Sequence, residues 1–221
     1  MRNLARQFHT QLTDALRGRV RHGTLGRLIF IAALAAMGYG AVMGSFGVLY
    51  GQSGWQVLFA AIKSPMLLAV TFVLTLPSFL VINLLLGLGR DVKDVLHALA
   101  AGQVAVSVGL LSLSPLTLLW YLSVPRYEPA ILFNAAMFAV ASLGGQRPLR
   151  ALYRPLILRN PLHRRMLVIW LTVYAFVGVQ AGWVMRPFIG KPDAPAEFLR
   201  PEKWDNAYVV IVKILYRSVV P

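Results

Sequence analysis

The chain has 221 residues, of which 57% are apolar and 14% are charged, and its net charge is +14. Soluble domains average roughly 45–50% apolar and about 25% charged residues. A soluble globular fold and a disordered chain are therefore both excluded. The sequence contains no cysteine, which also excludes disulfides, iron–sulfur clusters and cysteine nucleophiles. This composition is typical of a polytopic membrane protein.

Five apolar segments are long enough to cross a bilayer, which requires about 20 residues in a helix. They are residues 28–50, 65–89, 97–124, 129–145 and 166–185. The fourth segment is short and contains Asn134, so a re-entrant segment is the alternative there. The sequence predicts an all-α fold, a polytopic transmembrane helix bundle of five spans over residues 28–185.

The basic residues are distributed unevenly between the segments that connect these spans. Residues 1–27, 90–96 and 146–165 would share one side of the membrane and carry 14 of the 22 Lys and Arg residues. Because Lys and Arg accumulate on the cytoplasmic side, the N-terminus is predicted on the cytoplasmic side of the membrane and the C-terminus on the opposite side. This asymmetry accounts for the net charge, and we expect no nucleic-acid partner.

Amphipathic segments flank the five spans. In the cytoplasmic segment 1–27, apolar residues recur every four positions between residues 3 and 17, which predicts a helix that lies on the headgroups or docks on a partner. Residues 186–221 form an extracytoplasmic tail. A helix from about Asp205 to Arg217 is too short to span and is predicted to be interfacial or to dock on another subunit.

Small residues recur at a spacing of four in the first span. Such a pattern lets a second helix approach closely, from this chain or from another. The predicted helix-packing residues are Ala36, Gly40, Gly44, Gly47 and Gly51.

Ionisable residues inside spans mark transport or proton relay. Here each Asp, Glu, Lys and Arg between residues 28 and 185 is expected in a loop or at a span end, including Lys63 in the loop before the second span. Pro77 and Pro115 are expected to kink their helices, with nearby hydroxyls bonding to the freed carbonyls. Uncharged polar residues remain at depth, for which we favour helix packing over a substrate pocket between two spans. They are Thr75, Ser78, Asn83 and Ser112.

Motifs for catalysis and metal binding are missing from the sequence. It contains no H-E-x-x-H, G-x-S-x-G or Walker A motif. We therefore expect no catalytic residues, no cofactor and no metal ligands. A lipid-modifying enzyme is a third and weaker alternative.

A basic ledge without acidic residues lies between the fourth and fifth spans. Three prolines in residues 146–165 are expected to exclude one long helix and to leave short interfacial pieces. The ledge can bind anionic lipid headgroups or a partner, although the simpler interpretation is that it only fixes the topology. Its members are Arg147, Arg150, Arg154, Arg159, Arg164 and Arg165.

Two stretches of the sequence carry a family resemblance. One contains Lys63-Ser64-Pro65, Thr75-Leu76-Pro77-Ser78, Asn83 and Leu86-Gly87, and the other runs from Trp183 through Arg186, Pro187 and Phe188 to Gly190 and Pro192. Together they resemble an uncharacterised group of bacterial multi-spanning inner-membrane proteins, with a helix layout loosely similar to Yip1-type proteins. The resemblance covers about residues 60–205. It implies location and fold but no activity.

The second of these stretches also has a physical interpretation. Trp183 is expected to anchor the outer interface, and Arg186 to reach phosphate or to cap the last helical carbonyls. Pro187 and Phe188 are expected to turn the chain onto the membrane surface. The alternative is that Arg186 holds an acidic partner or a lipid.

These features predict a non-enzymatic integral membrane subunit that anchors or scaffolds a larger inner-membrane complex. Its expected partners are anionic lipids at the cytoplasmic face and other membrane protein subunits. The alternative is a small-molecule or lipid transporter or channel built around Pro77, Asn83, Ser112 and Pro115.

Overall fold

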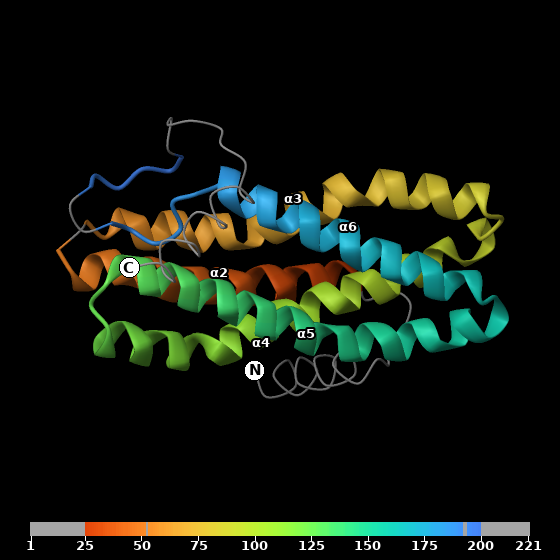
Figure 1. Cartoon of the computed structure of the whole chain (residues 1–221), viewed down its shortest axis with the longest axis horizontal. Helices are drawn as coiled ribbons and strands as arrows, with labels where there is room; N and C mark the ends of the chain where they lie inside the picture. Colours follow the sequence, from red (N-terminus) through yellow and green to blue (C-terminus); the bar gives the residue numbers. More distant parts are fainter. Residues whose placement is uncertain (1–24, 52, 192–193, 200–221) are drawn as a thin grey trace, which may run out of the picture.

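The computed structural model describes residues 25–51, 53–191 and 194–199. These residues form five long α-helices and one short 3-10 helix, without strands (Figure 1). The helices are α2 (Leu25–Leu49), α3 (Trp55–Leu85), η1 (Gly89–Asp91), α4 (Val92–Ser123), α5 (Tyr127–Arg159) and α6 (Leu162–Val184). The predicted flanking helices, at residues 3–17 and 205–217, lie outside the described residues.

All five long helices are long and apolar enough to cross a membrane. The prediction of an all-α bundle with five apolar helices is therefore confirmed. α3, α4 and α5 contain 31, 32 and 33 residues. At 1.5 Å per residue they measure about 46–50 Å, whereas the hydrocarbon core is about 30 Å thick. α3 begins ten residues before the predicted span, and α5 ends 14 residues after it.

α5 is one continuous helix that includes Pro148 and Pro155. The prediction that prolines divide this segment into short pieces is therefore wrong, and no re-entrant turn interrupts residues 129–145. A proline inside a helix costs about 3 kcal/mol. Leu149, Tyr153 and Leu156 are buried on the same stretch. These side chains pack against neighbouring helices, and such packing lets a membrane helix tolerate prolines in its interior.

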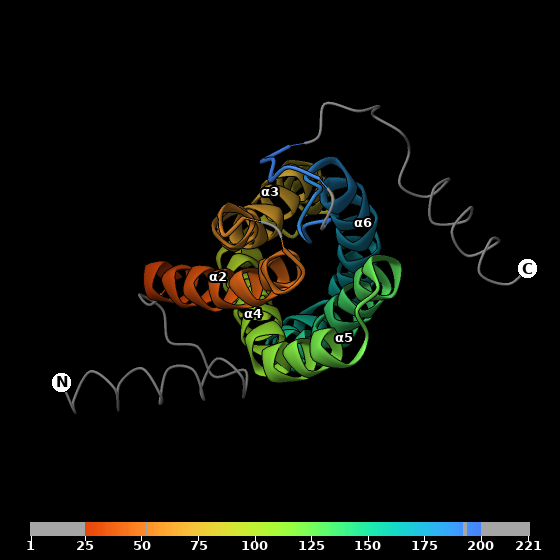
Figure 2. The ribbon, with the colours of Figure 1, turned by 90° about the vertical axis from the view of Figure 1, so that its left-hand side faces the viewer.

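The helices follow one another around the bundle axis in the order α2, α3, α6, α5 and α4, and each packs against the next (Figure 2). Along the bundle axis, α2 and α6 lie toward opposite ends of the bundle (Figure 1). The end with the α5–α6 turn is named the inner end, after the predicted orientation, and the end with the α4–α5 turn is named the outer end.

Two large clusters of buried side chains fill the bundle, and a third, smaller one contains Leu28, Ile31 and Val104. The outer cluster joins α2, α4, α5 and the segment after α6, and it is built around Tyr39, Phe46, Tyr121 and Ile189. The inner cluster joins α3, α4, α5 and α6. Its members are Phe79, Leu88, Val95, Ala98, Leu99, Leu149, Tyr153, Leu156, Met166, Leu167 and Trp170. Only α4 and α5 contribute helical residues to both clusters.

α2 packs against α3 through small residues. A Cβ atom on Gly44 would lie 2.6 Å from the backbone carbonyl oxygen of Gln56, and one on Gly40 would collide with the backbone carbonyl oxygen of Ala60. Ala36 and Gly47 are also buried on α2. The partner of these glycines is therefore a helix of the same chain. Gly51 instead lies in the turn after α2 with a φ of 97°, and a Cβ there would meet nothing within 4 Å.

Pro115 lies inside α4, and its surroundings show how the helix tolerates a proline. Pro115 cannot donate a hydrogen bond to the Leu111 carbonyl one turn earlier. The hydroxyl of Ser114 donates to that carbonyl at 2.6 Å. The expected compensation by a neighbouring hydroxyl is therefore confirmed at Pro115.

Candidate functional site

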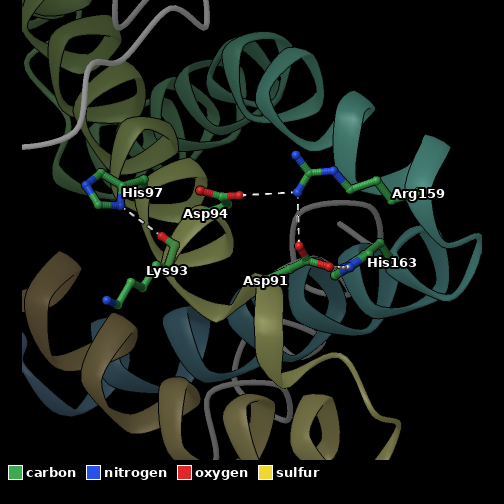
Figure 3. Close-up of polar contacts among 6 residues, drawn as sticks. All are labelled: Asp91, Lys93, Asp94, His97, Arg159 and His163. Carbon is green, nitrogen blue, oxygen red and sulfur yellow. Dashed lines mark hydrogen bonds and ion pairs between the residues drawn. The ribbon is translucent and has the colours of Figure 1, made fainter.

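Charged residues gather at the inner end, where η1, α4, α5 and α6 meet (Figure 3). Nε2 of His163 lies 3.1 Å from one oxygen of Asp91, and the guanidinium of Arg159 donates to the other oxygen at 3.1 Å. Arg159 also lies 3.5 Å from the carboxylate of Asp94. These contacts fasten the start of α4 to the turn between α5 and α6.

The local sequence at this turn places His163 within hydrogen-bond distance of Asp91. α5 ends at Arg159, and the side-chain oxygen of Asn160 accepts a hydrogen bond of 3.0 Å from the Leu162 backbone N–H, which helps to start α6. His163 then falls in the first turn of α6 with 0% of its surface exposed. Its ring packs edge-on against Tyr153 at 6.4 Å between centroids.

Asp91 precedes α4 and is partly exposed. The hydrogen bond with His163 lowers the pKa of its carboxyl below the ordinary value, and Arg159 adds to this effect while partial burial opposes it. The ionised carboxylate is therefore favoured in the folded protein. A His–Asp pair can perform acid–base chemistry, but this imidazole is buried away from solvent. The pair is best explained as an electrostatic tie between helix ends.

The six arginines of the predicted ledge fall into three sets. Arg159 is held by Asp91 and Asp94. Three others are exposed on α5 at spacings of three and four, which places them within about 60° of one another around the helix. These three, Arg147, Arg150 and Arg154, are named the arginine face of α5. The last two, Arg164 and Arg165, are exposed in the first turn of α6.

Apolar side chains of α3 and α6 are exposed at the same depth as the arginine face of α5. Tyr153 contacts His163, and Leu149 shares a cluster with Leu167 and Trp170. The arginine face therefore runs beside residues 163–170 of α6. On that stretch Val168 is 58% exposed, and Val81 of α3 is 54% exposed. The charged face of α5 and the exposed apolar side chains of α3 and α6 therefore lie at a similar distance from the inner end of the bundle.

A second polar site lies near the outer end, around Lys63. The prediction that Lys63 lies in a loop is wrong, because α3 begins at Trp55 and Lys63 is 0% exposed inside the bundle. Its ammonium group donates to the Pro187 carbonyl at 2.8 Å and lies 4.9 Å from the centre of the Phe198 ring. The Gln56 amide donates to the same carbonyl at 3.2 Å.

The segment after α6 enters the bundle instead of turning onto its surface. The guanidinium of Arg186 stacks on Trp183 at 3.8 Å, whereas Pro187 and Ile189 are buried. The Phe188 carbonyl accepts a hydrogen bond of 3.1 Å from Gln56. The hydrogen bond between Lys63 and Pro187 therefore joins the two stretches that carry the family resemblance, although they are far apart in the sequence.

The structure does not bring together the polar residues of the predicted transport site. The Thr75 hydroxyl donates to the Thr71 carbonyl and the Asn83 amide to the Phe79 carbonyl, each at 2.8 Å within α3. Ser78 and Ser112 are exposed on the bundle exterior. α3 and α4 are not neighbours around the ring, and Pro77 lies toward the inner end whereas Pro115 lies toward the outer end.

A buried polar network at the outer end was missed by sequence reasoning. The Tyr39 hydroxyl donates to the Asn134 side-chain oxygen at 2.9 Å, and the Asn134 amide donates to the Tyr121 hydroxyl at 2.6 Å. Tyr121 in turn donates to the Met43 carbonyl at 3.3 Å. Tyr121 is fully buried. In the sequence, the only sign of this network is one Asn in an apolar span, and its position does not show which residues it bonds to.

Comparisons with known proteins returned no match to any family model, curated protein or solved structure.

Proposed function

We propose that this chain is a non-enzymatic integral membrane subunit that anchors or scaffolds a larger assembly in a bacterial inner membrane. The observation that supports this proposal is the arginine face of α5, which runs beside an apolar stretch of α6. An acidic segment of another subunit is the partner that this face requires.

The depth of the arginines follows from the packing of α5 on α6. Arg154 is level with His163, about one turn before the apolar stretch of α6 begins at Met166, and Arg147 lies about 10 Å deeper along the axis. Helices tilt by about 20° on average, which shifts neighbours 8–10 Å apart by only about 3 Å in depth. Tilt alone therefore leaves Arg147 at hydrocarbon depth.

An uncompensated arginine at this depth is costly. Insertion scales give about 2.5–3.5 kcal/mol for an Arg at the centre of a span, and the cost is smaller toward the span end, where Arg147 lies. Within the part of the chain that the structure describes, no ion pair joins Arg147, Arg150 or Arg154 to an acid. Carboxylates on a partner helix would satisfy them with charge-assisted hydrogen bonds.

Crosslinking in the native membrane, followed by purification in mild detergent and partner identification, tests this proposal. The Arg150→Glu/Arg154→Glu variant should lose a partner that the unaltered chain retains. Arg126→Glu, an exposed position at the outer end, is the matched control and should retain it. Recovery of a lone monomer from the unaltered chain, or equal retention by both variants, would contradict the proposal.

A transporter is the second candidate, and the burial of Lys63 favours it. A buried ammonium group inside a membrane helix is a common mark of an ion or substrate path. Solute flux into proteoliposomes, abolished by Asn83→Leu or Lys63→Met, would support transport over scaffolding.

A further inference from the structure

Arg164 and Arg165 lie one helical turn before exposed apolar residues of α6. Residues four apart lie on the same face of a helix, so Arg164 is followed by Val168 and Arg165 by Ile169. These four residues line a shallow, open hollow of about 450 Å³. Further along α6, Phe176 continues the exposed apolar surface toward the outer end.

The two arginines offer positive charge that the described residues do not neutralise. The nearby acids Asp91 and Asp94 are engaged by Arg159, and Asp91 also by His163. No ion pair links Arg164 or Arg165 to an acid within the described ranges. Guanidinium groups bind phosphate in a two-pronged geometry, so an anionic phosphate complements the two exposed arginines beside the hollow, whose own lining is apolar.

We propose that this hollow binds an anionic phospholipid. The phosphate contacts the guanidinium groups of Arg164 and Arg165, and an acyl chain lies over Val168 and Ile169 toward Phe176. A free phosphate would use the arginines but leave the apolar lining exposed, and a neutral lipid would do the reverse. Only a ligand with an anionic head and an apolar tail matches both parts of the surface.

This site is independent of the acidic partner proposed for α5, because it uses a different helix. The test therefore needs only the purified, delipidated full chain. Native mass spectrometry and thermal unfolding in detergent would be recorded with phosphatidylglycerol and with phosphatidylcholine of the same chain length. We expect phosphatidylglycerol to bind at least about tenfold more tightly and to raise the unfolding temperature.

Two variants separate the headgroup contact from the chain contact. Arg164→Gln/Arg165→Gln should lower the affinity for phosphatidylglycerol about tenfold. Val168→Ser/Ile169→Ser should also lower it while keeping both charges. Arg90→Gln/Arg126→Gln removes the same charge at two exposed positions outside α6 and should leave the affinity unchanged. If the double glutamine variant aggregates on size exclusion, Arg165→Gln alone should give a smaller loss in the same direction.

Three outcomes would overturn the proposal. The first is an equal loss of affinity in the Arg90/Arg126 control, which would mean that total charge alone attracts the lipid. The second is unchanged binding in both α6 variants. The third is that inorganic phosphate stabilises the chain as much as phosphatidylglycerol does, which would identify an anion site without a lipid.

Discussion

The ammonium group of Lys63 lies 2.8 Å from the carbonyl oxygen of Pro187, although 124 positions separate the two residues. This hydrogen bond fastens the segment after α6 to the first turns of α3. A buried charge is costly unless it is paired or hydrogen-bonded. Here a carbonyl oxygen and the face of the Phe198 ring replace water around the ammonium group.

We expect Lys63→Met to release the segment after α6 without unfolding the bundle. Loss of a hydrogen bond that contributes about 1 kcal/mol increases local opening about fivefold. Hydrogen exchange of peptides that cover residues 186–191 should therefore become faster, while peptides from α4 keep their rates. Lys93→Met, an exposed position at the inner end, is the control. Unchanged exchange in the Lys63 variant would show that the Gln56 hydrogen bonds and packing hold the segment without Lys63.

Substitution of Gly44 should destabilise the α2–α3 pair. A methyl group there would lie 2.6 Å from the Gln56 oxygen and 2.7 Å from the Val57 Cα, so the helices must separate. Overpacking of this kind costs about 1–3 kcal/mol. Gly44→Ala should therefore lower the midpoint of thermal unfolding in detergent, followed by tryptophan fluorescence.

Gly144 provides the matched control, because a Cβ there meets nothing within 4 Å on α5. Gly144→Ala should leave the midpoint unchanged or raise it, since Ala is favoured over Gly in helices by up to about 1 kcal/mol. Equal behaviour of the two variants would mean that α2 and α3 are not in close contact.

Apolar runs predicted the existence of the five long helices, but not where the helices end. Hydropathy identifies the residues that are apolar enough for the hydrocarbon core. The positions of the helix ends depend on packing outside those residues. α5 continues past residue 145 because Leu149, Tyr153 and Leu156 are buried against neighbouring helices. Neither these partners nor the net cost of Pro148 and Pro155 can be obtained from sequence spacing alone.

The polar sites were less predictable because their members come from distant parts of the chain. Spacing on one helix groups Arg147, Arg150 and Arg154, but it does not show that Arg159 is held by Asp91. Lys63 likewise resembled a loop charge, since its carbonyl partner lies beyond the last helix. Sequence patterns identify residues that share a helix face, whereas contacts between helices require the fold.

The tie between Asp91 and His163 should give the inner end a pH-dependent stability. The folded-state pKa of Asp91 is lowered, so its contribution is present above the unfolded value of about 3.9 and is lost as the pH falls through the folded value. At pH 7, Asp91→Asn should cost about 1–3 kcal/mol, because it weakens hydrogen bonds to charged groups.

Thermal unfolding of both proteins between pH 7 and pH 3 checks this sign. The difference between the unaltered chain and Asp91→Asn should be largest at pH 7 and should shrink below about pH 4. Glu128→Gln, at an exposed acid of the outer end, should show a smaller difference at pH 7. A difference that grows on acidification would contradict the assignment of Asp91 as the ionised partner.

The network of Tyr39, Asn134 and Tyr121 should be energetically coupled across α2, α5 and α4. Asn134→Leu removes the acceptor of the Tyr39 hydroxyl and a donor to Tyr121. Tyr39→Phe removes only the first of these hydrogen bonds, so the pair forms a double-mutant cycle. Coupling between polar side chains of membrane helices averages about 0.6 kcal/mol and reaches about 1.7 kcal/mol. We expect a value toward the upper end, because both hydroxyls are fully buried. The cycle would be measured by reversible unfolding in mixed micelles, and a coupling near zero would mean that Tyr39 and Asn134 stabilise the bundle independently.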